Sequence, residues 1–413
     1  MQEIKRTMLS DLQNHLNQKE ITLIIGPRQV GKTTLMKKLK KYLDDAWKKT
    51  LFLNLDIEND KQFFGTQEKF LQKVQLEIGG SGFVFIDEIQ KKENAGIFLK
   101  WIYDMDLPYK FIISGSGSLE LKEKIHESLA GRKRMFECFP VSFLEFIDFK
   151  TAYKFSDTLQ DFFLLEQEKT QNYLVEYLNF GGYPRVILET EFSEKKAMID
   201  EIYRSYVSKD ISYLLKIEKE EAFMMMLKII ASQAWELLNY SQLAAQVGVN
   251  ELTLKNYLYY AINTFAVKQV SPFFRNKQKE ILKAKMLYFN DLGMRNYMLG
   301  LMGNLDNPAH LWFVFQNFVY KLLYEKYCTT SLQIKFWRTT DQTKVDFILE
   351  DGERVTPVEV KYSRLTKPEI TRSLKSFCER YAPEEVIVVN LTLRDEVMFG
   401  ASKVVFKPFW ELA

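Results

Sequence analysis

The chain contains few of the residues that build disulfide frameworks or zinc sites. Of its 413 residues, only three are cysteines and three are histidines. Cys138, Cys328 and Cys378 are far apart and form no C-x-x-C pair, so neither a zinc site nor a disulfide scaffold is indicated. A reducing cytosol is therefore the simplest expectation for its surroundings.

The sequence also lacks a long apolar run and a strong excess of one charge. No stretch approaches the length of a membrane span, and Met1–Leu12 has no apolar signal core, so we expect a cytoplasmic protein without a membrane partner. Lys and Arg number 57 against 54 Asp and Glu, which gives a formal net charge of +3. Overall charge therefore does not argue for nucleic acid, and any basic surface must be local.

The most informative motif that is present is Gly26–Thr33, which fits the pattern G-x-x-x-x-G-K-[ST] of a phosphate-binding loop. An apolar run at 21–25 precedes it and a helical pattern follows it. In this order, backbone N–H groups converge on a polyphosphate, Lys32 neutralises phosphate charge and Thr33 ligates Mg²⁺. The expected ATP-binding residues are Gly26, Pro27, Arg28, Gln29, Val30, Gly31, Lys32, Thr33 and Thr34.

Two acids end another apolar strand, at 83–86. In a P-loop fold, Asp87 is expected on the metal side and Glu88 is placed to polarise the attacking water. A strand at 110–113 follows, after which Ser114 is the first candidate and Ser116 the second for a group that senses the γ-phosphate. Plain structural explanations, a strand leaving the core and a simple turn, remain the alternatives.

Basic residues precede a fifth expected strand at Met135–Phe139. A guanidinium beside the γ-phosphate, from the same chain or from a neighbouring subunit, accelerates phosphoryl transfer by orders of magnitude. Arg132 is the first candidate for this catalytic role and Arg134 is the second. A solvated basic turn is the alternative.

Five segments together resemble the archaeal and bacterial P-loop ATPases of the AAA superfamily that carry a C-terminal domain of unknown function 4143. These segments are Gly26–Thr33, Phe83–Gln90, Leu129–Arg132, Phe139–Phe146 and Gly181–Pro184. The resemblance extends over nearly the whole chain and implies an α/β fold with an AAA-like parallel sheet. With the length of the chain, it predicts an ATPase core at 1–150 and a helical lid at 151–218.

The segment 241–258 has the form of a helix-turn-helix inside a winged helix at 219–290. Ser241 is expected to cap the first helix and Gly248 to make the turn, while strands at 266–272 and 281–289 would form the wing. Cations on this unit would neutralise DNA phosphates. The candidate DNA-binding residues are Lys255, Arg275, Lys277 and Lys279. A winged helix used only for packing or protein contacts is the alternative.

The remaining residues, 291–413, predict a helix, three strands, a helix and a strand. This order, with Asp346, Glu359 and Lys361, resembles the PD-(D/E)xK nuclease core, in which the two acids hold a divalent ion and the lysine steadies the nucleophile. Relatives often place a glutamate on the first helix, where this chain has Gln316, and Glu325 lies about 180° around that helix. A degenerate core used for binding or dimerisation is the alternative.

The sequence thus predicts an enzyme that binds ATP and Mg²⁺, with Glu88, Lys32, Ser114 and Arg132 as its catalytic residues. Its preferred function is ATP hydrolysis coupled to DNA binding or remodelling. An ATP-gated DNA nuclease that acts in defence is one alternative. A signalling ATPase that binds a partner protein according to its nucleotide state is the other. Assembly into a homo-oligomer is compatible with each of these functions.

Overall fold

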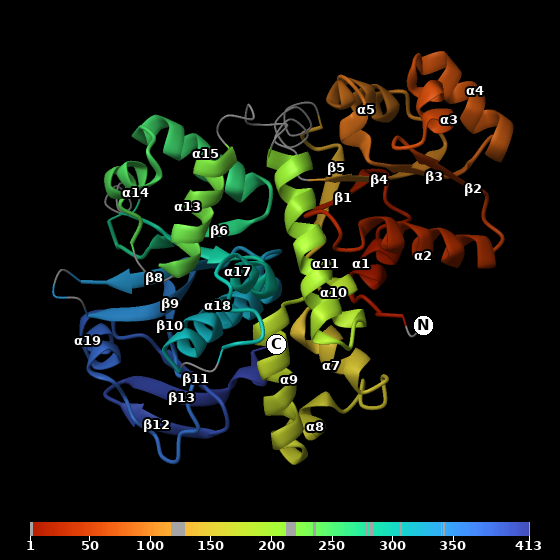
Figure 1. Ribbon diagram of the computed structural model, residues 1–413. Helices are drawn as coiled ribbons and strands as arrows, with labels where there is room; N and C mark the ends of the chain where they lie inside the picture. Colours follow the sequence, from red (N-terminus) through yellow and green to blue (C-terminus); the bar gives the residue numbers. More distant parts are fainter. Residues whose placement is uncertain are drawn as a thin grey trace.

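The structure is a computed structural model that describes residues 3–116, 129–211, 220–233, 237–276, 280, 284–305, 308–339, 341 and 343–412. An N-terminal α/β domain is followed by a helical region and by a C-terminal domain built on a mixed sheet (Figure 1). The three cysteines form no disulfide. None of the described helices is long and apolar enough to cross a lipid bilayer.

Five parallel strands form the N-terminal sheet, in the order β2–β3–β4–β1–β5. They are β1 (Ile21–Gly26), β2 (Thr50–Asn54), β3 (Gly82–Asp87), β4 (Tyr109–Ser116) and β5 (Lys133–Glu137). The parallel sheet is confirmed, although β5 begins and ends two residues before the predicted strand. Apolar residues fill β1 and most of β3 because helices cover both faces of the sheet.

The two faces carry different helices. Helices α1 (Met8–Asn14) and α2 (Lys32–Asp45) pack on one face, and α4 (Gln67–Ile78) and α5 (Ala95–Asp104) pack on the other. Their apolar residues recur at helical spacing, as in α4, where Phe70, Val74 and Ile78 are buried. Since all five strands run in one direction, their carboxyl ends meet at a single edge of the sheet.

The chain then forms α7 (Phe143–Lys150), α8 (Leu159–Leu165), α9 (Gln167–Phe180), α10 (Pro184–Leu188) and α11 (Phe192–Ser205). Pro184 is the first residue of α10, where its missing N–H is no loss. Helix α11 continues as a π-helical segment, Tyr206–Ile211. Figure 1 shows α11 between the N-terminal domain and the helices α13 and α17.

The next elements are α13 (Glu220–Ser232), α14 (Tyr240–Val247) and α15 (Glu251–Asn263). Gly248 makes the turn between α14 and α15 with φ 76°, as predicted. The predicted cap was wrong. Helix α14 begins one residue before Ser241, so the side chain of Asn239 caps it by accepting the backbone N–H of Gln242, at 3.2 Å.

The hairpin that follows α15, β6 (Val267–Pro272) and β7 (Met286–Phe289), is not a free wing. Strand β6 pairs in parallel with β8, with Ser271 opposite Lys335 and Pro272 opposite Phe336. Lys335 also pairs with Glu280 of the hairpin connection, at 2.6 Å. The hairpin therefore extends the C-terminal sheet, in which the strand order is β12–β13–β11–β10–β9–β8–β6–β7.

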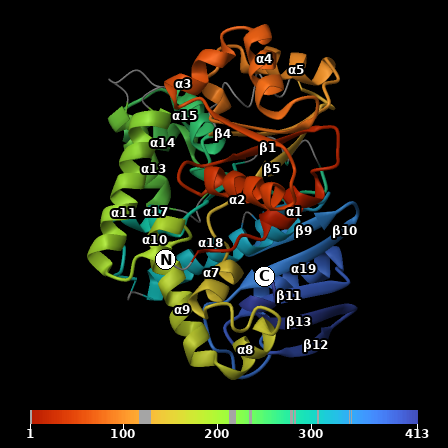
Figure 2. The same ribbon diagram turned by 90° about the vertical axis from the view of Figure 1, so that its right-hand side faces the viewer.

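The C-terminal strands are β8 (Gln333–Arg338), β9 (Lys344–Asp351), β10 (Arg354–Val360), β11 (Glu385–Asn390), β12 (Asp395–Phe399) and β13 (Ser402–Pro408). Their helices are α17 (Leu292–Met298), α18 (Pro308–Tyr327) and α19 (Arg372–Tyr381). The sequence predicted α18, β8, β9, β10 and β11, and placed the start of α19 five residues too early. Figure 2 shows α18 close to α7 and α9, where one hydrophobic core joins these helices to the C-terminal sheet.

Candidate functional site

The loop between β1 and α2 has the backbone of a phosphate cradle. Gly26 has φ 154°, and a Cβ there would lie 2.3 Å from the carbonyl oxygen of Cys138, so only glycine fits. Gln29 and Gly31 have φ 62° and 97°, left-handed conformations of the kind that aim successive N–H groups into an anion-binding concavity. A Cβ on Gly31 would meet nothing within 4 Å, so the space beside the loop is open.

Lys32 lies under this loop with its side chain buried. Its ammonium donates to the carbonyl oxygens of Gly26, at 3.0 Å, and Pro27, at 2.7 Å. Burial lowers the pKa of Lys32, while the Glu88 carboxylate acts in the opposite direction. An ammonium held only by neutral carbonyls in a dry site gains most from an anion, so it fits a bound phosphate.

Three oxygen-bearing side chains meet at the carboxyl edge of the sheet. Thr33 donates its hydroxyl hydrogen to Asp87, with Oγ1 and Oδ2 2.7 Å apart, and Ser114 donates to the other carboxylate oxygen. They meet because β4, which carries Ser114, lies between β1 and β3. Hydroxyl and carboxylate oxygens are the ligands that Mg²⁺ prefers, so the donor set fits this ion.

Glu88 directly follows β3 in a left-handed conformation, with φ 58° and ψ 42°. Such backbone costs a residue with a side chain about 1 kcal/mol or more, and strain of this kind is frequent at functional sites. The backbone N–H of Glu88 donates to Ser114, at 3.3 Å, and its carboxylate accepts a hydrogen bond from the Gln90 amide. The side chain lines the same cavity as Lys32, as expected for a group that orients a water beside the γ-phosphate.

The cavity beside the loop has a volume of about 750 Å³. Apolar atoms of Ile4, Pro184 and Leu188 line it together with the cations Lys38 and Lys209. Its walls thus come from the segment before α1, from α2, from α10 and from the end of α11. A mixed apolar and cationic lining of this size suits a nucleotide, which has a flat base and an anionic tail.

Two side chains of the loop itself are bonded to the helical region. Arg28 pairs with Asp210 of the π-helical segment, with Nε and Oδ1 2.7 Å apart. Arg185 of α10 donates to the Gln29 side chain at 3.1 Å and pairs with Glu201 at 2.6 Å. Sequence reasoning missed both contacts, although Arg185 directly follows the segment Gly181–Pro184 that contributed to the resemblance.

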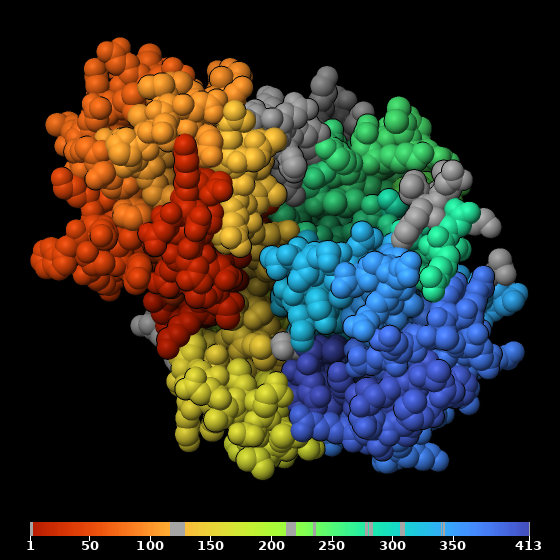
Figure 3. Space-filling model, turned by 180° about the vertical axis from the view of Figure 1, so that it is seen from behind, coloured from red at the N-terminus to blue at the C-terminus, as the bar shows by residue number. Residues whose placement is uncertain are grey.

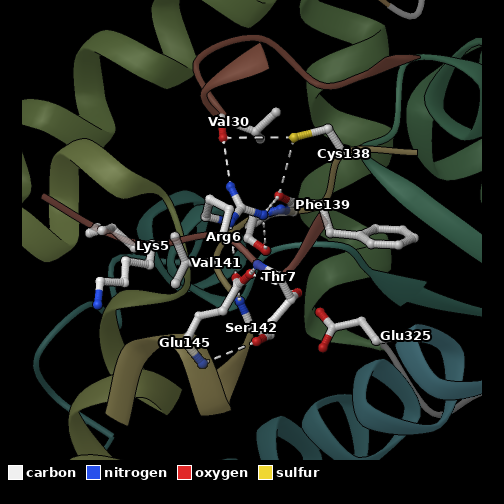
Figure 4. Close-up of polar contacts among 12 residues, drawn as sticks. Lys5, Arg6, Thr7, Val30, Cys138, Phe139, Val141, Ser142, Glu145 and Glu325 are labelled. Carbon is white, nitrogen blue, oxygen red and sulfur yellow. Dashed lines mark hydrogen bonds and ion pairs between the residues drawn. The ribbon is translucent and has the colours of Figure 1, made fainter. Parts of the chain in front are cut away.

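Arg6 supports the loop from behind (Figure 4). Its guanidinium donates to the carbonyl oxygens of Val30, at 3.0 Å, and Phe139, at 2.6 Å, and pairs with Glu145 at 2.9 Å. Glu145 also caps α7 and accepts the N–H of Thr7. No local pattern marks Arg6, since its partners lie 24 to 139 residues away along the chain.

A further buried carboxyl lies next to this group. Figure 4 shows Glu325, from α18, beside Arg6, Thr7 and Glu145. Burial raises the pKa of Glu325 to about 7, because Lys321, 3.6 Å away, offsets only part of the loss of solvation. Glu325 and Gln316 face different sides of α18, as their spacing in the sequence predicts, because Gln316 points toward Asp346.

Arg132 lies far from the phosphate loop within the chain. The carbonyl oxygen of Arg132 accepts the N–H of Ile21, so Arg132 lies at the amino end of β1, about 20 Å from the loop along the strand. Its guanidinium pairs with Asp104, at 2.7 Å. Arg134 follows on β5 opposite Thr22, also near that end. A role for Arg132 within its own chain is therefore wrong, and a role toward a neighbouring subunit stays a prediction. The side chain of Ser116 lies outside the described residues.

The C-terminal candidates do lie close together. The last residues paired between β9 and β10 are Phe347 and Val358, so Asp346 and Glu359 follow where these strands separate. Lys361 pairs with one oxygen of Glu359, at 2.7 Å, and Thr371 donates to the other. The residues of the predicted nuclease-like site are therefore neighbours in the fold.

This group does not offer a ready metal site. Asp346 accepts hydrogen bonds from the Gln316 amide, at 3.1 Å, and from the backbone N–H of Val360, at 2.9 Å. Burial raises the pKa of Asp346 to about 6, which disfavours the ionised form that a metal requires. Across the described part of the chain, no three His, Cys, Asp or Glu side chains form a group that could hold a metal ion. The arrangement fits a carboxyl pair held by protein donors better than it fits a divalent-ion site.

The candidate DNA-binding residues occupy different settings. Lys255 is exposed on α15 and lies over the ring of Tyr240, at 5.7 Å. Arg275 is exposed near Tyr381 of α19, at 6.0 Å. Lys277 and Lys279 lie outside the described residues.

The sequence matches known domain families over three stretches. Residues 18–147 match the AAA domain, residues 171–305 match the domain of unknown function 8612, and residues 313–410 match the domain of unknown function 4143. An uncharacterized protein of Mycobacterium tuberculosis is 24% identical over 375 residues, which cover 90% of this chain and 76% of that protein. An uncharacterized protein of Methanocaldococcus jannaschii is 24% identical over 389 residues, covering 93% and 83%.

Solved structures give partial overlaps. The Aeropyrum pernix ORC1 protein in complex with DNA is 10% identical and covers 71% of this chain and 91% of its own, with a TM-score of 0.33. AMPPCP-bound DnaA from Aquifex aeolicus is 13% identical, covers 61% and 85%, and has a TM-score of 0.25. Taken with the loop geometry, the family matches show that this chain carries an AAA-type P-loop ATPase domain followed by the domains of unknown function 8612 and 4143, like its uncharacterized bacterial and archaeal relatives.

Proposed function

We propose that the protein hydrolyses Mg-ATP and that its nucleotide state sets the position of the helical region. The observation that carries this proposal is the pair of contacts from the loop to that region, Arg28 to Asp210 and Gln29 to Arg185. A triphosphate entering the loop brings several negative charges beside Arg28, and they compete with Asp210 for the guanidinium. Binding and release of the nucleotide therefore change a contact with the π-helical segment that follows α11.

The residues at the carboxyl edge divide the chemistry among them. Lys32 and the loop N–H groups bind the phosphates, Thr33 and Asp87 hold the ion, and Glu88 orients the attacking water. Mg²⁺, when bound there, neutralises charge that develops on the phosphates. Ser114 holds the Asp87 carboxylate in place and contacts the backbone of Glu88, so it links the metal side to the water side.

We further propose that Arg132 acts on a neighbouring subunit. It stands on the edge of the sheet opposite its own loop, so only a second chain could bring it to a γ-phosphate. A homo-oligomer in which the β5 end of this edge, at the far side of the sheet from β2, faces the loop of the next chain meets this need. Sedimentation of the Arg132→Ala variant with Mg-ATP separates assembly from catalysis, because loss of turnover with assembly preserved supports the role.

Calorimetry and hydrogen exchange test the main proposal. Mg-ATP should release heat on binding to the wild type, and backbone exchange in Tyr206–Ile211 should change on binding. Asp210→Asn should still bind Mg-ATP but lose the exchange response, while Asp161→Asn, the matched change at an exposed acid of α8, should keep both. Absence of binding heat in the wild type overturns the nucleotide site. An unchanged response in Asp210→Asn overturns the coupling.

DNA is the second part of the proposal, as the partner that the ATPase cycle serves. The observation in its favour is the exposed face of α15, which presents Lys255, Asn256 and Tyr259 after the turn at Gly248. Such a face, in the second helix of a helix-turn-helix, is placed to enter a major groove. DNA should then stimulate ATP hydrolysis, and Lys255→Glu should cancel the stimulation.

The ATPase assay with DNA also separates the two alternative functions, when the integrity of the DNA is measured in the same sample. An ATP-gated nuclease would cleave the DNA with Mg²⁺ and would lose that activity in Asp346→Ala. Because hydrogen-bond donors of the protein already bind Asp346 and Glu359, we expect the DNA to remain intact. A signalling ATPase would show neither stimulation nor cleavage, and its mass in solution with a protein partner would depend on the nucleotide.

A further inference from the structure

A hollow of about 690 Å³ opens at the amino edge of the N-terminal sheet, the edge opposite the phosphate loop. Its lining includes residues that precede β1, β2, β3 and β4. Figure 1 shows the end of α2 and the start of β2 on the outer side of the N-terminal domain, away from the C-terminal sheet. In the view from behind, Figure 3, this domain forms a lobe of its own. The hollow is thus separate from the nucleotide cavity and from α15.

Trp47 lines the open side of this hollow in a backbone conformation that favours glycine. Its side chain is 95% exposed, and its φ is 56°. The turn ends α2 through bonds from the N–H of Trp47 to Asp44 and from the N–H of Lys48 to Leu43, both 2.9 Å. Glycine is the usual residue at the left-handed position of such a helix end. The left-handed backbone at Trp47 costs free energy, and the exposed indole gains no stability from burial. The residue therefore does not stabilise the folded chain, and its ring face is available to a ligand.

The charged side chains that line the hollow are mostly positive. Lys48 and Lys49 directly follow it, are exposed, line the hollow and form no ion pair with a described carboxylate. Asp106 is the one acid among the described residues of the lining, and it pairs with Lys19 at 2.7 Å. An anionic ligand therefore meets two ammonium groups that pair with no described carboxylate, beside an exposed aromatic ring.

We propose that this hollow binds single-stranded nucleic acid, with a base stacked on Trp47 and the backbone phosphates on Lys48 and Lys49. The combination of an exposed ring with neighbouring cations selects this chemistry. Every base has a face that can stack, and stacking on an aromatic side chain is tolerant of sequence. A cationic ligand for the indole would be repelled by the lysines. In a duplex, the base faces are already stacked on one another, so the ring has nothing to contact.

Fluorescence anisotropy with a labelled oligothymidylate tests the proposal. The wild type should bind the single strand more tightly than the matching duplex, and the affinity should fall steeply with salt. Trp47→Gly, which suits the left-handed turn, should weaken binding about tenfold, while Trp47→Tyr should keep most of it. Lys48→Glu with Lys49→Glu should remove binding, because both phosphate contacts become repulsive.

Three controls keep the outcome specific to this site. Leu76→Ala removes another exposed apolar side chain of the same domain, on α4 and 81% exposed, and should leave binding unchanged. Lys255→Glu reverses a charge on α15, where DNA contact is proposed, and Lys32→Ala removes the cation of the ATP site, so these two variants test whether binding of the single strand depends on either site. Melting curves confirm that each variant is folded.

Several results overturn the proposal. If the wild type and Trp47→Gly bind the single strand with equal affinity, no base stacks on Trp47. If Lys255→Glu is the variant that loses binding while the Trp47 and lysine variants keep it, the single strand binds at α15 instead. Equal binding of a polyglutamate peptide would show an acidic protein as the partner instead. Lys32→Ala is measured beside every variant, so a defect in the ATP site can be distinguished from a defect in this hollow.

Discussion

Replacing Arg6 with methionine removes the support behind the phosphate loop while roughly keeping the volume. The Arg6 side chain is only 8% exposed, and its donors hold Val30, Phe139 and Glu145 at once. The change removes this donor from two carbonyls and leaves the buried Glu145 carboxylate without its cation, with only the neutral donors of Thr7 and Ser142. Removing one member of a buried ion pair costs about 3–5 kcal/mol, and we expect a loss of that size in the free energy of unfolding. Affinity for Mg-ATP should fall as well, because Val30 belongs to the loop.

Urea unfolding of a double-mutant cycle measures the interaction itself. Arg6→Met, Glu145→Gln and the double variant are compared with the wild type, and Mg-ATP affinity is followed in parallel. Because the two side chains are in contact, the losses should not add, and a coupling energy of about 2 kcal/mol is expected. A loss under about 1 kcal/mol for Arg6→Met, or strict additivity in the double variant, would refute the support that we assign to this arginine.

Three other predictions concern catalysis, pH and the turn at Trp47. Lys32→Ala should show no binding heat with Mg-ATP, whereas Glu88→Gln should bind it and turn over about 100-fold more slowly; turnover at the wild-type rate would show that the assigned base is wrong. The folded pKa of Glu325, about 7, lies above its ordinary value of 4.5, so the native state keeps a proton that the unfolded state has lost between these values. Stability should therefore fall by about 3 kcal/mol as the pH rises through this window, and urea midpoints of Glu325→Gln should lack that fall. Trp47→Gly should raise the unfolding free energy by about 1 kcal/mol and Trp47→Ala should not, because only glycine relieves the left-handed backbone; equal melting temperatures would contradict this reasoning.

The N-terminal sheet could be predicted from sequence because its signals are local. A buried parallel strand is a continuous apolar run, and the loop Gly26–Thr33 combines a fixed spacing with the strand before it and the helix after it. Asp87 and Ser114 each follow such a run, so parallel strands alone bring them to one edge. The expected neighbours of Lys32 were therefore found together.

What the sequence did not reveal depends on pairings between distant segments. Arg6 meets Glu145 only after the segment before α1 has packed under the loop, and Arg28 meets Asp210 only when the end of α11 reaches it. Arg132 resembled a catalytic arginine by its place before β5, but the amino end of that strand lies at the wrong edge for its own loop. The strands β12 and β13 were missed, and so was the pairing of β6 with β8, since strand order is set by contacts across the whole domain.

The pairing of β6 with β8 has a practical meaning for anyone who wishes to cut this protein into pieces. A cut after residue 290 would separate two hydrogen-bonded strands, expose the ladder edge of β6 in the first piece and of β8 in the second, and leave Lys335 without Glu280. Unprotected strand edges recruit copies of themselves, so recombinant fragments that end or begin there should precipitate. A soluble shortened version must keep the helix-turn-helix and the last domain together.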